Sequence, residues 1–243
     1  MTKDLTQGKI TPLLVKFTIP LLFGNIFQLM YNSVDSIIVG QLVGKEALAA
    51  VGTSNPLMTL AILFVNGMCI GASILMGTQY GAKKMDVLKR QISTTMIAGI
   101  VFSITVTLFC ILFARPLLLL IRVQEEVLPL AVPYLRIVFL GFIFTFIYNF
   151  FACTLRALGD SKTPLYFLIF TTLLNITFNI VFIYCMKLGV AGSALGTVCA
   201  MTVSVFCCLL YIGKKYPILH PQKEDWKLNW QFCKQHLKIA VPM

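Results

Sequence analysis

A small set of polar side chains lies within otherwise apolar segments of the sequence. Asp35 is the one carboxylate placed inside such a segment, while Asn175 and Asn179 share another. The two asparagines are four residues apart, so a helix would place both on one face, and Ser193 and Thr197 have the same spacing. A carboxylate, two amides and a hydroxyl from three segments could form an oxygen-lined pocket for a hard monovalent cation or a proton. Because a charge at the centre of a bilayer costs at least about 2.5–3.5 kcal/mol, Asp35 is a candidate functional residue.

Each of these polar groups also has a structural interpretation. Membrane asparagine and threonine side chains often join helices through hydrogen bonds worth about 0.6 kcal/mol each. Asp35 is close to Leu42, so it could lie near the membrane surface and face water. Arg136 could extend its side chain to the interface, or it could form an ion pair with Asp35. Pro20 could be a hinge, because proline removes one helical hydrogen bond, or it could be an ordinary membrane proline.

The composition requires that these residues be positioned by membrane helices. Hydrophobic residues make up 58% of the 243 residues and charged residues only 12%. A soluble domain has about 25% charged residues, and a disordered chain is poor in apolar ones. At about 20 apolar residues per span, six spans and short loops fill this length. The predicted fold is therefore all-α: a polytopic six-helix bundle with expected spans at about 13–42, 55–80, 92–113, 130–155, 164–186 and 190–212.

The distribution of Lys and Arg predicts the orientation of the bundle. Fifteen of the 20 lie in the N-terminal segment, the loops after the second and fourth helices, and the tail. Four lie in the loops on the opposite side, and Arg136 is within the fourth helix. Basic residues concentrate on the cytoplasmic side of membrane proteins. We therefore expect both termini in the cytoplasm, and we do not interpret the net charge of +11 as a nucleic-acid surface.

Known catalytic and metal-binding motifs are not recognisable in the sequence. Seven of the eight cysteines lie in apolar stretches, and no CxxC motif or Cys/His pair has zinc spacing. There is no P-loop, no HExxH and no Ser/His/Asp set. We therefore expect neither an enzyme nor a cofactor, and no metal beyond a coupling Na⁺.

The order of several motifs resembles the multidrug and toxic compound extrusion (MATE) family of secondary transporters. Essentially the whole chain takes part in this resemblance. The motifs, in order, are Phe17-Thr18-Ile19-Pro20 with Asn25 and Asp35; Gly44-Lys45-Glu46-Ala47-Leu48-Ala49-Ala50-Val51-Gly52, similar to the first external loop of the family; Gln79-Tyr80-Gly81-Ala82; Arg156-Ala157-Leu158-Gly159-Asp160-Ser161-Lys162-Thr163-Pro164; and Gly189-Val190-Ala191-Gly192-Ser193-Ala194-Leu195-Gly196-Thr197.

This resemblance implies a fold of two six-helix bundles around a central cavity in the cell membrane. It also implies export of lipophilic or cationic drugs and other toxic compounds in exchange for H⁺ or Na⁺. The cation site that it implies comprises Asp35, Asn175 and Thr197, with Asn179 at a position where the family usually has aspartate. The expected site therefore has one carboxylate instead of two, and Pro20 is the expected hinge.

The end of the sequence predicts that the chain is one half of a longer transporter. Residues 1–213 would form the six-helix bundle, and residues 214–243 a cytoplasmic basic linker with the start of a seventh helix. The match between Lys238-Ile239-Ala240-Val241-Pro242 and Lys16-Phe17-Thr18-Ile19-Pro20 suggests a second copy of the first half. The missing C-terminal half or a second copy of the chain would complete it. Two alternatives are a lipid-linked oligosaccharide flippase, which should have more basic residues facing its cavity, and an inactive truncated membrane scaffold.

Overall fold

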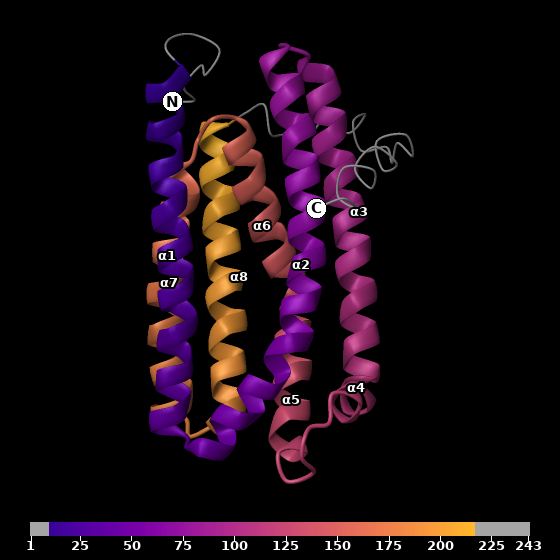
Figure 1. The fold of residues 1–243 in the computed structure, drawn as a ribbon, viewed down its shortest axis with the longest axis vertical. Helices are drawn as coiled ribbons and strands as arrows, with labels where there is room; N and C mark the ends of the chain where they lie inside the picture. Colours follow the sequence, from indigo (N-terminus) through magenta and orange to yellow (C-terminus); the bar gives the residue numbers. More distant parts are fainter. Residues whose placement is uncertain (1–9, 217–243) are drawn as a thin grey trace.

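Long apolar runs in the sequence form the long helices of one bundle (Figure 1). The computed structural model describes residues 10–216, and within this range all regular elements are helical. In chain order they are α1 (Ile10–Leu42), α2 (Lys45–Gly81), α3 (Met85–Leu112), α4 (Ala114–Leu120), α5 (Leu128–Leu140), α6 (Phe142–Ala157), α7 (Lys162–Ile180), the π-helical segment η1 (Val181–Cys185) and α8 (Gly189–Lys215).

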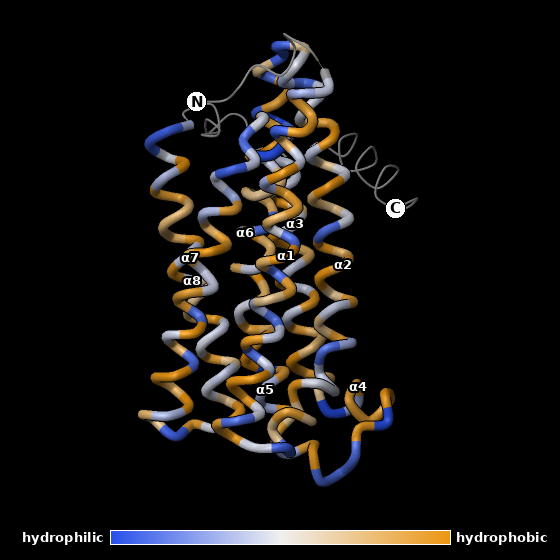
Figure 2. Tube along the Cα trace, turned by 60° about the vertical axis from the view of Figure 1, so that its left-hand side comes forward, coloured by the Kyte–Doolittle hydropathy of each residue, from blue (hydrophilic) through white to orange (hydrophobic). Residues whose placement is uncertain are grey.

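Five of these helices are long and apolar enough to cross a membrane, and α5 and α6 together provide a sixth span. Apolar residues run along the whole bundle, with polar residues at the ends and at scattered positions between (Figure 2). Large apolar side chains such as Leu63 and Leu112 are exposed on its outer surface. A lipid environment explains this exposure, because only there does it carry no hydrophobic cost. The chain is a multi-pass membrane protein, as the composition predicted.

The fourth span is bent, where the sequence pattern predicted one continuous helix. α5 and α6 meet at Gly141 with a bend of 46°. A Cβ atom on Gly141 would come within 2.5 Å of Val198 in α8, so only glycine allows this close approach. The bend therefore lies where the fourth span packs against α8.

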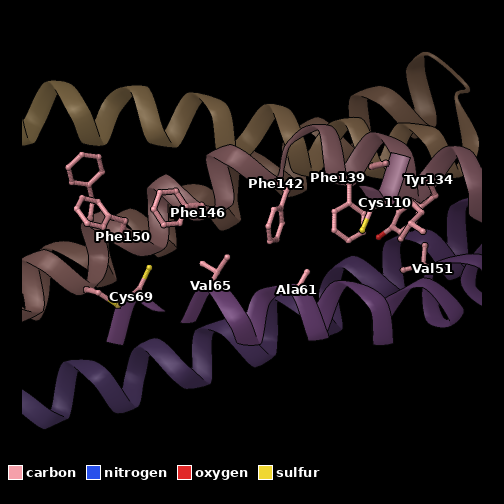
Figure 3. Close-up of a cluster of buried hydrophobic side chains, with 14 of the residues drawn as sticks. Val51, Ala61, Val65, Cys69, Cys110, Tyr134, Phe139, Phe142, Phe146 and Phe150 are labelled. Carbon is pink, nitrogen blue, oxygen red and sulfur yellow. The ribbon is translucent and has the colours of Figure 1, made fainter. Parts of the chain in front are cut away.

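Phenylalanines from the bent span form the core of the bundle. Phe139, Phe142, Phe146 and Phe150 face small residues of α2 such as Ala61, Val65 and Cys69 (Figure 3). The rings of Phe146 and Phe150 stack with centroids 5.9 Å apart. Because three of these phenylalanines recur every four residues, they line one helix face and fix α5 and α6 against α2.

The second helix begins ten residues before its expected start. The Gly44 backbone has a φ of 119°, which glycine adopts readily, and this residue makes the tight turn after α1. From Lys45 onward the chain is helical, so the motif that resembles an external loop is the first part of α2. The expected seventh-helix start and most of the basic linker lie outside the described residues.

Candidate cation site

Three helices bring the predicted polar residues into one hydrogen-bonded chain. Asn179 in α7 donates from Nδ2 to Asp35 Oδ1 in α1 at 2.6 Å and to Asn175 Oδ1 at 3.2 Å. Asn175 donates in turn from Nδ2 to Thr197 Oγ1 in α8 at 3.1 Å. The two hydrogen bonds between helices join residues 22 and 144 positions apart in the sequence, and Figure 1 shows α1, α7 and α8 side by side. The i, i+4 spacing of the asparagines places both amides on the α7 face between the other two helices.

The amides are buried, whereas the carboxylate is only half-buried. Asn175 is 1% exposed and Asn179 is completely buried. Asp35 and Thr197 are both of intermediate exposure. Asp35 has one oxygen held by Asn179, and no ion pair to this carboxylate is found within residues 10–216. A proton or a small cation can therefore bind at the second oxygen while the bond from Asn179 remains.

Two further residues shape this cluster, and sequence analysis missed both. The Tyr31 side chain lies near Thr197 and Asp35. It is one helical turn before Asp35, so the i, i+4 rule that paired the asparagines could have found it. Gly196 lies against Asn179, and a Cβ atom added there would be 2.1 Å from Asn179 Oδ1. The Gly192–Gly196 spacing of small residues was a signal for such close packing.

The carbonyl oxygen of Asn179 is the unusual atom of the cluster. Asn179 Oδ1 is buried and has no hydrogen-bond donor among the described residues. Such an atom costs about 1–3 kcal/mol unless a donor or a cation satisfies it. The π-helical segment η1 begins two residues later, at Val181, and such segments often occur at functional sites. Sequence periodicity predicted ordinary helix here.

Other residues considered in the sequence do not join the chain of hydrogen bonds. The buried Ser193 Oγ has no hydrogen-bond partner in the described part of the chain. Arg136 donates from Nε to the Ile111 carbonyl oxygen at 3.2 Å instead of pairing with Asp35. Pro20 lies inside the continuous helix α1, 15 residues before Asp35. Within residues 10–216, no group of three or more His, Cys, Asp or Glu side chains could hold a metal ion.

Comparison with known proteins agrees with this architecture. The family model described as MatE matches residues 20–181, which is more than half of the chain. The chain belongs to the MatE family. Among its curated MatE relatives, the probable multidrug resistance protein YpnP of Bacillus subtilis is 32% identical over 98% of this chain and 53% of its own length. YoeA, also a probable multidrug resistance protein of B. subtilis, is 35% identical over 93% of this chain and 50% of its own length.

A solved MatE-type structure has the same fold. A MATE in the bent conformation superposes with a TM-score of 0.91 and 25% identity, covering all of this chain and 55% of that one. The chain thus spans about half the length of the MatE relatives it matches. Members of this family are transporters, and the single bundle described above corresponds to one half of such a protein.

Proposed function

We propose that this chain is the N-terminal bundle of a secondary antiporter that exports lipophilic or cationic drugs in exchange for H⁺ or Na⁺. The observation that supports this most directly is Asp35. Among the described residues, Glu46 and Asp86 lie in the first turns of their membrane helices, whereas Asp35 lies well inside α1. The α7 residue Asn179 holds Asp35 within a three-helix polar cluster. An ionisable group in this setting typically marks an ion pathway. The names of the relatives, which are multidrug resistance proteins, support the class of cargo.

Asp35 would couple ion binding to the position of α1. With its charge uncompensated, Asp35 favours binding of a proton or Na⁺ at the oxygen that Asn179 does not occupy. For Na⁺, the carbonyl oxygen of Asn175 and the Thr197 hydroxyl would be further oxygen ligands of the type that hard cations prefer. A bound ion and a bound drug that favour different states of the bundle would drive exchange, because only differential affinity shifts such an equilibrium.

Pro20 is the proposed hinge of this movement. Proline cannot donate to the carbonyl four residues before it, so α1 lacks one internal hydrogen bond at this level. The helix segment that carries Asp35 can therefore tilt relative to the segment before Pro20 when the charge of Asp35 changes.

Replacement of Asp35 tests the proposal in a complete transporter that contains this bundle. We expect Asp35→Asn to abolish drug efflux driven by an imposed ion gradient in liposomes, with normal insertion into the membrane. Glu46→Gln, which changes an exposed acid in the first turn of α2, is the matched control and should retain efflux. Imposing a pH gradient or a Na⁺ gradient separately identifies the coupling ion. Efflux at the wild-type rate in the Asp35→Asn protein would exclude Asp35 as the coupling group.

A further inference from the structure

A cavity away from the cation site lies between α4 and the first half of the fourth span. It has a volume of about 620 Å³ and is formed by α4, the segment that follows it, and the first half of α5. Two arginines, Arg115 and Arg136, and one glutamate, Glu125, line it together with apolar residues such as Val132 and Ile137. Figure 1 shows α4 and α5 next to each other at the lower end of the bundle.

The two guanidinium groups are available to a ligand. Arg136 uses Nε for the Ile111 carbonyl oxygen at 3.2 Å, and this bond orients the group. Its terminal amino groups have no acceptor within residues 10–216, and neither Arg115 nor Glu125 forms an ion pair there. Two uncompensated arginines beside one carboxylate give the cavity a net positive charge. Guanidinium groups bind phosphate oxygens through paired hydrogen bonds, so the ligand chemistry that fits is a phosphate ester.

The position of the cavity indicates that this phosphate belongs to a lipid. Arg136 lies eight residues into α5, about 12 Å along a helix that is half of a membrane span. The neighbouring helix α4 exposes Leu119 and Leu120, the latter at 79%, and carries Arg115 near its start. A short helix with exposed leucines and arginine is typical of one that lies in the membrane interface, where lipid phosphates are. The apolar lining residues would contact the acyl chains.

We propose that this cavity binds a glycerophospholipid, with its phosphate between Arg115 and Arg136 and the polar end of its headgroup toward Glu125. The bound lipid would link α4 to α5 and so hold the first half of the bent span in place. This site is separate from Asp35, and the proposal does not depend on the coupling mechanism.

Lipid binding by the purified full chain tests the proposal. With phosphatidylglycerol added to mixed micelles, we expect native mass spectrometry to show one retained lipid per chain and the thermal midpoint to rise by several degrees. Arg115→Gln removes a side chain without a protein hydrogen bond, so it should fold normally and bind phosphatidylglycerol about tenfold more weakly. Arg122→Gln, a nearby exposed arginine that does not line the cavity, is the control and should bind like the wild type.

Two further probes distinguish the source of the phosphate. Diacylglycerol, which has acyl chains but no phosphate, and inorganic phosphate, which has no acyl chains, should each leave the midpoint unchanged. Equal retention of phosphatidylglycerol by the Arg115→Gln and Arg122→Gln proteins would overturn the proposal. Stabilisation by inorganic phosphate alone would also overturn it, because the site would then bind a free anion.

Discussion

Asn179 connects the carboxylate to the rest of the polar cluster. Its amino group holds Asp35 and Asn175 together, while its carbonyl oxygen points at the backbone of α8 beside Gly196. One side chain therefore links α1, α7 and α8. A change that moves Asn179 should alter the affinity of Asp35 for its ion without changing any charge in the cluster.

Gly196→Ala makes this change. The new Cβ atom would lie 2.1 Å from Asn179 Oδ1 and 3.1 Å from its backbone nitrogen, so the amide must rotate or α8 must move away. Overpacking of this kind typically costs about 1–3 kcal/mol. We expect ion-coupled efflux by the complete transporter to fall about tenfold or more, with a smaller loss of thermal stability. Gly67→Ala in α2 has open space around it and should have little effect. Equal efflux by the two variants would argue against a positioning role for Gly196.

The residue types of this cluster could be predicted, but their pairing could not. Helical spacing alone placed Asn175 and Asn179 on one face. The position of the Asn179 amide depends on how closely α7 and α8 approach each other at Gly196. A glycine has no side chain, so the hydropathy pattern does not reveal this contact. Tyr31 does not stand out in the sequence, because hydropathy groups tyrosine with the apolar residues of its helix.

At the scale of elements, the start of α7 is fixed by Asp160. Asp160 Oδ1 accepts hydrogen bonds from the backbone N–H groups of Lys162 at 3.1 Å and Thr163 at 3.0 Å. Its other oxygen accepts from the Thr163 hydroxyl at 2.6 Å and from the Tyr216 hydroxyl just after α8. Burial acts to raise the pKa of Asp160, but these hydrogen bonds outweigh it and hold the pKa below the ordinary value of 3.8. One carboxylate thus ties the start of α7 to the end of α8.

Asp160→Ala should therefore destabilise the bundle in a pH-dependent way. Loss of a helix cap lowers the free energy of unfolding by about 0.5–2 kcal/mol. In a domain of this size, each kcal/mol lost lowers the thermal midpoint by about 2–4 °C. The pKa of Asp160 is lower in the native state than in the unfolded state, where it is about 3.9. The stabilisation that Asp160 contributes is therefore fully present above about pH 3.9 and is lost as the pH falls through the native pKa. Thermal unfolding can be measured in detergent at pH 7 and at pH 3.5. The difference in thermal midpoint between the wild type and the Asp160→Ala variant should be smaller at pH 3.5. Asp86→Ala, which changes an exposed acid, is the control. A difference in thermal midpoint between the wild type and Asp160→Ala that stays constant with pH would contradict the charge-based account.

The existence of the helices followed from composition, whereas their irregularities did not. An apolar run of span length predicts a helix in lipid because no other element satisfies its backbone there. The bend at Gly141 and the π-helical turns of η1 depend instead on contacts with α8, made through Val198 and through Gly192 beside Phe182. The early start of α2 was missed because its first turns carry Lys45 and Glu46, which hydropathy assigns to a loop.

At the scale of the whole molecule, the two ends of the bundle differ in charge. Lys83, Lys84 and Lys162 lie at one end, together with the last turn of α8 and its Lys214 and Lys215 (Figure 1). The other end has fewer basic groups among the described residues, and two of these, Arg115 and Arg136, line the proposed lipid cavity. The basic end should face the cytoplasm, because basic loops are retained on that side during insertion.

Cys185 is a native reporter of this orientation. It is the exposed one among the seven cysteines that the structure describes, and it lies at the end of η1, away from the basic end. We expect a membrane-impermeant maleimide to label Cys185 on intact cells and Cys185→Ala to remove this labelling. In the Cys185→Ala background, Lys83→Cys places a thiol in the turn between α2 and α3, and it should be labelled only after the membrane is permeabilised. Surface labelling of Lys83→Cys without permeabilisation would reverse the orientation, and Asp35 would then be nearer the cytoplasmic than the external end of α1.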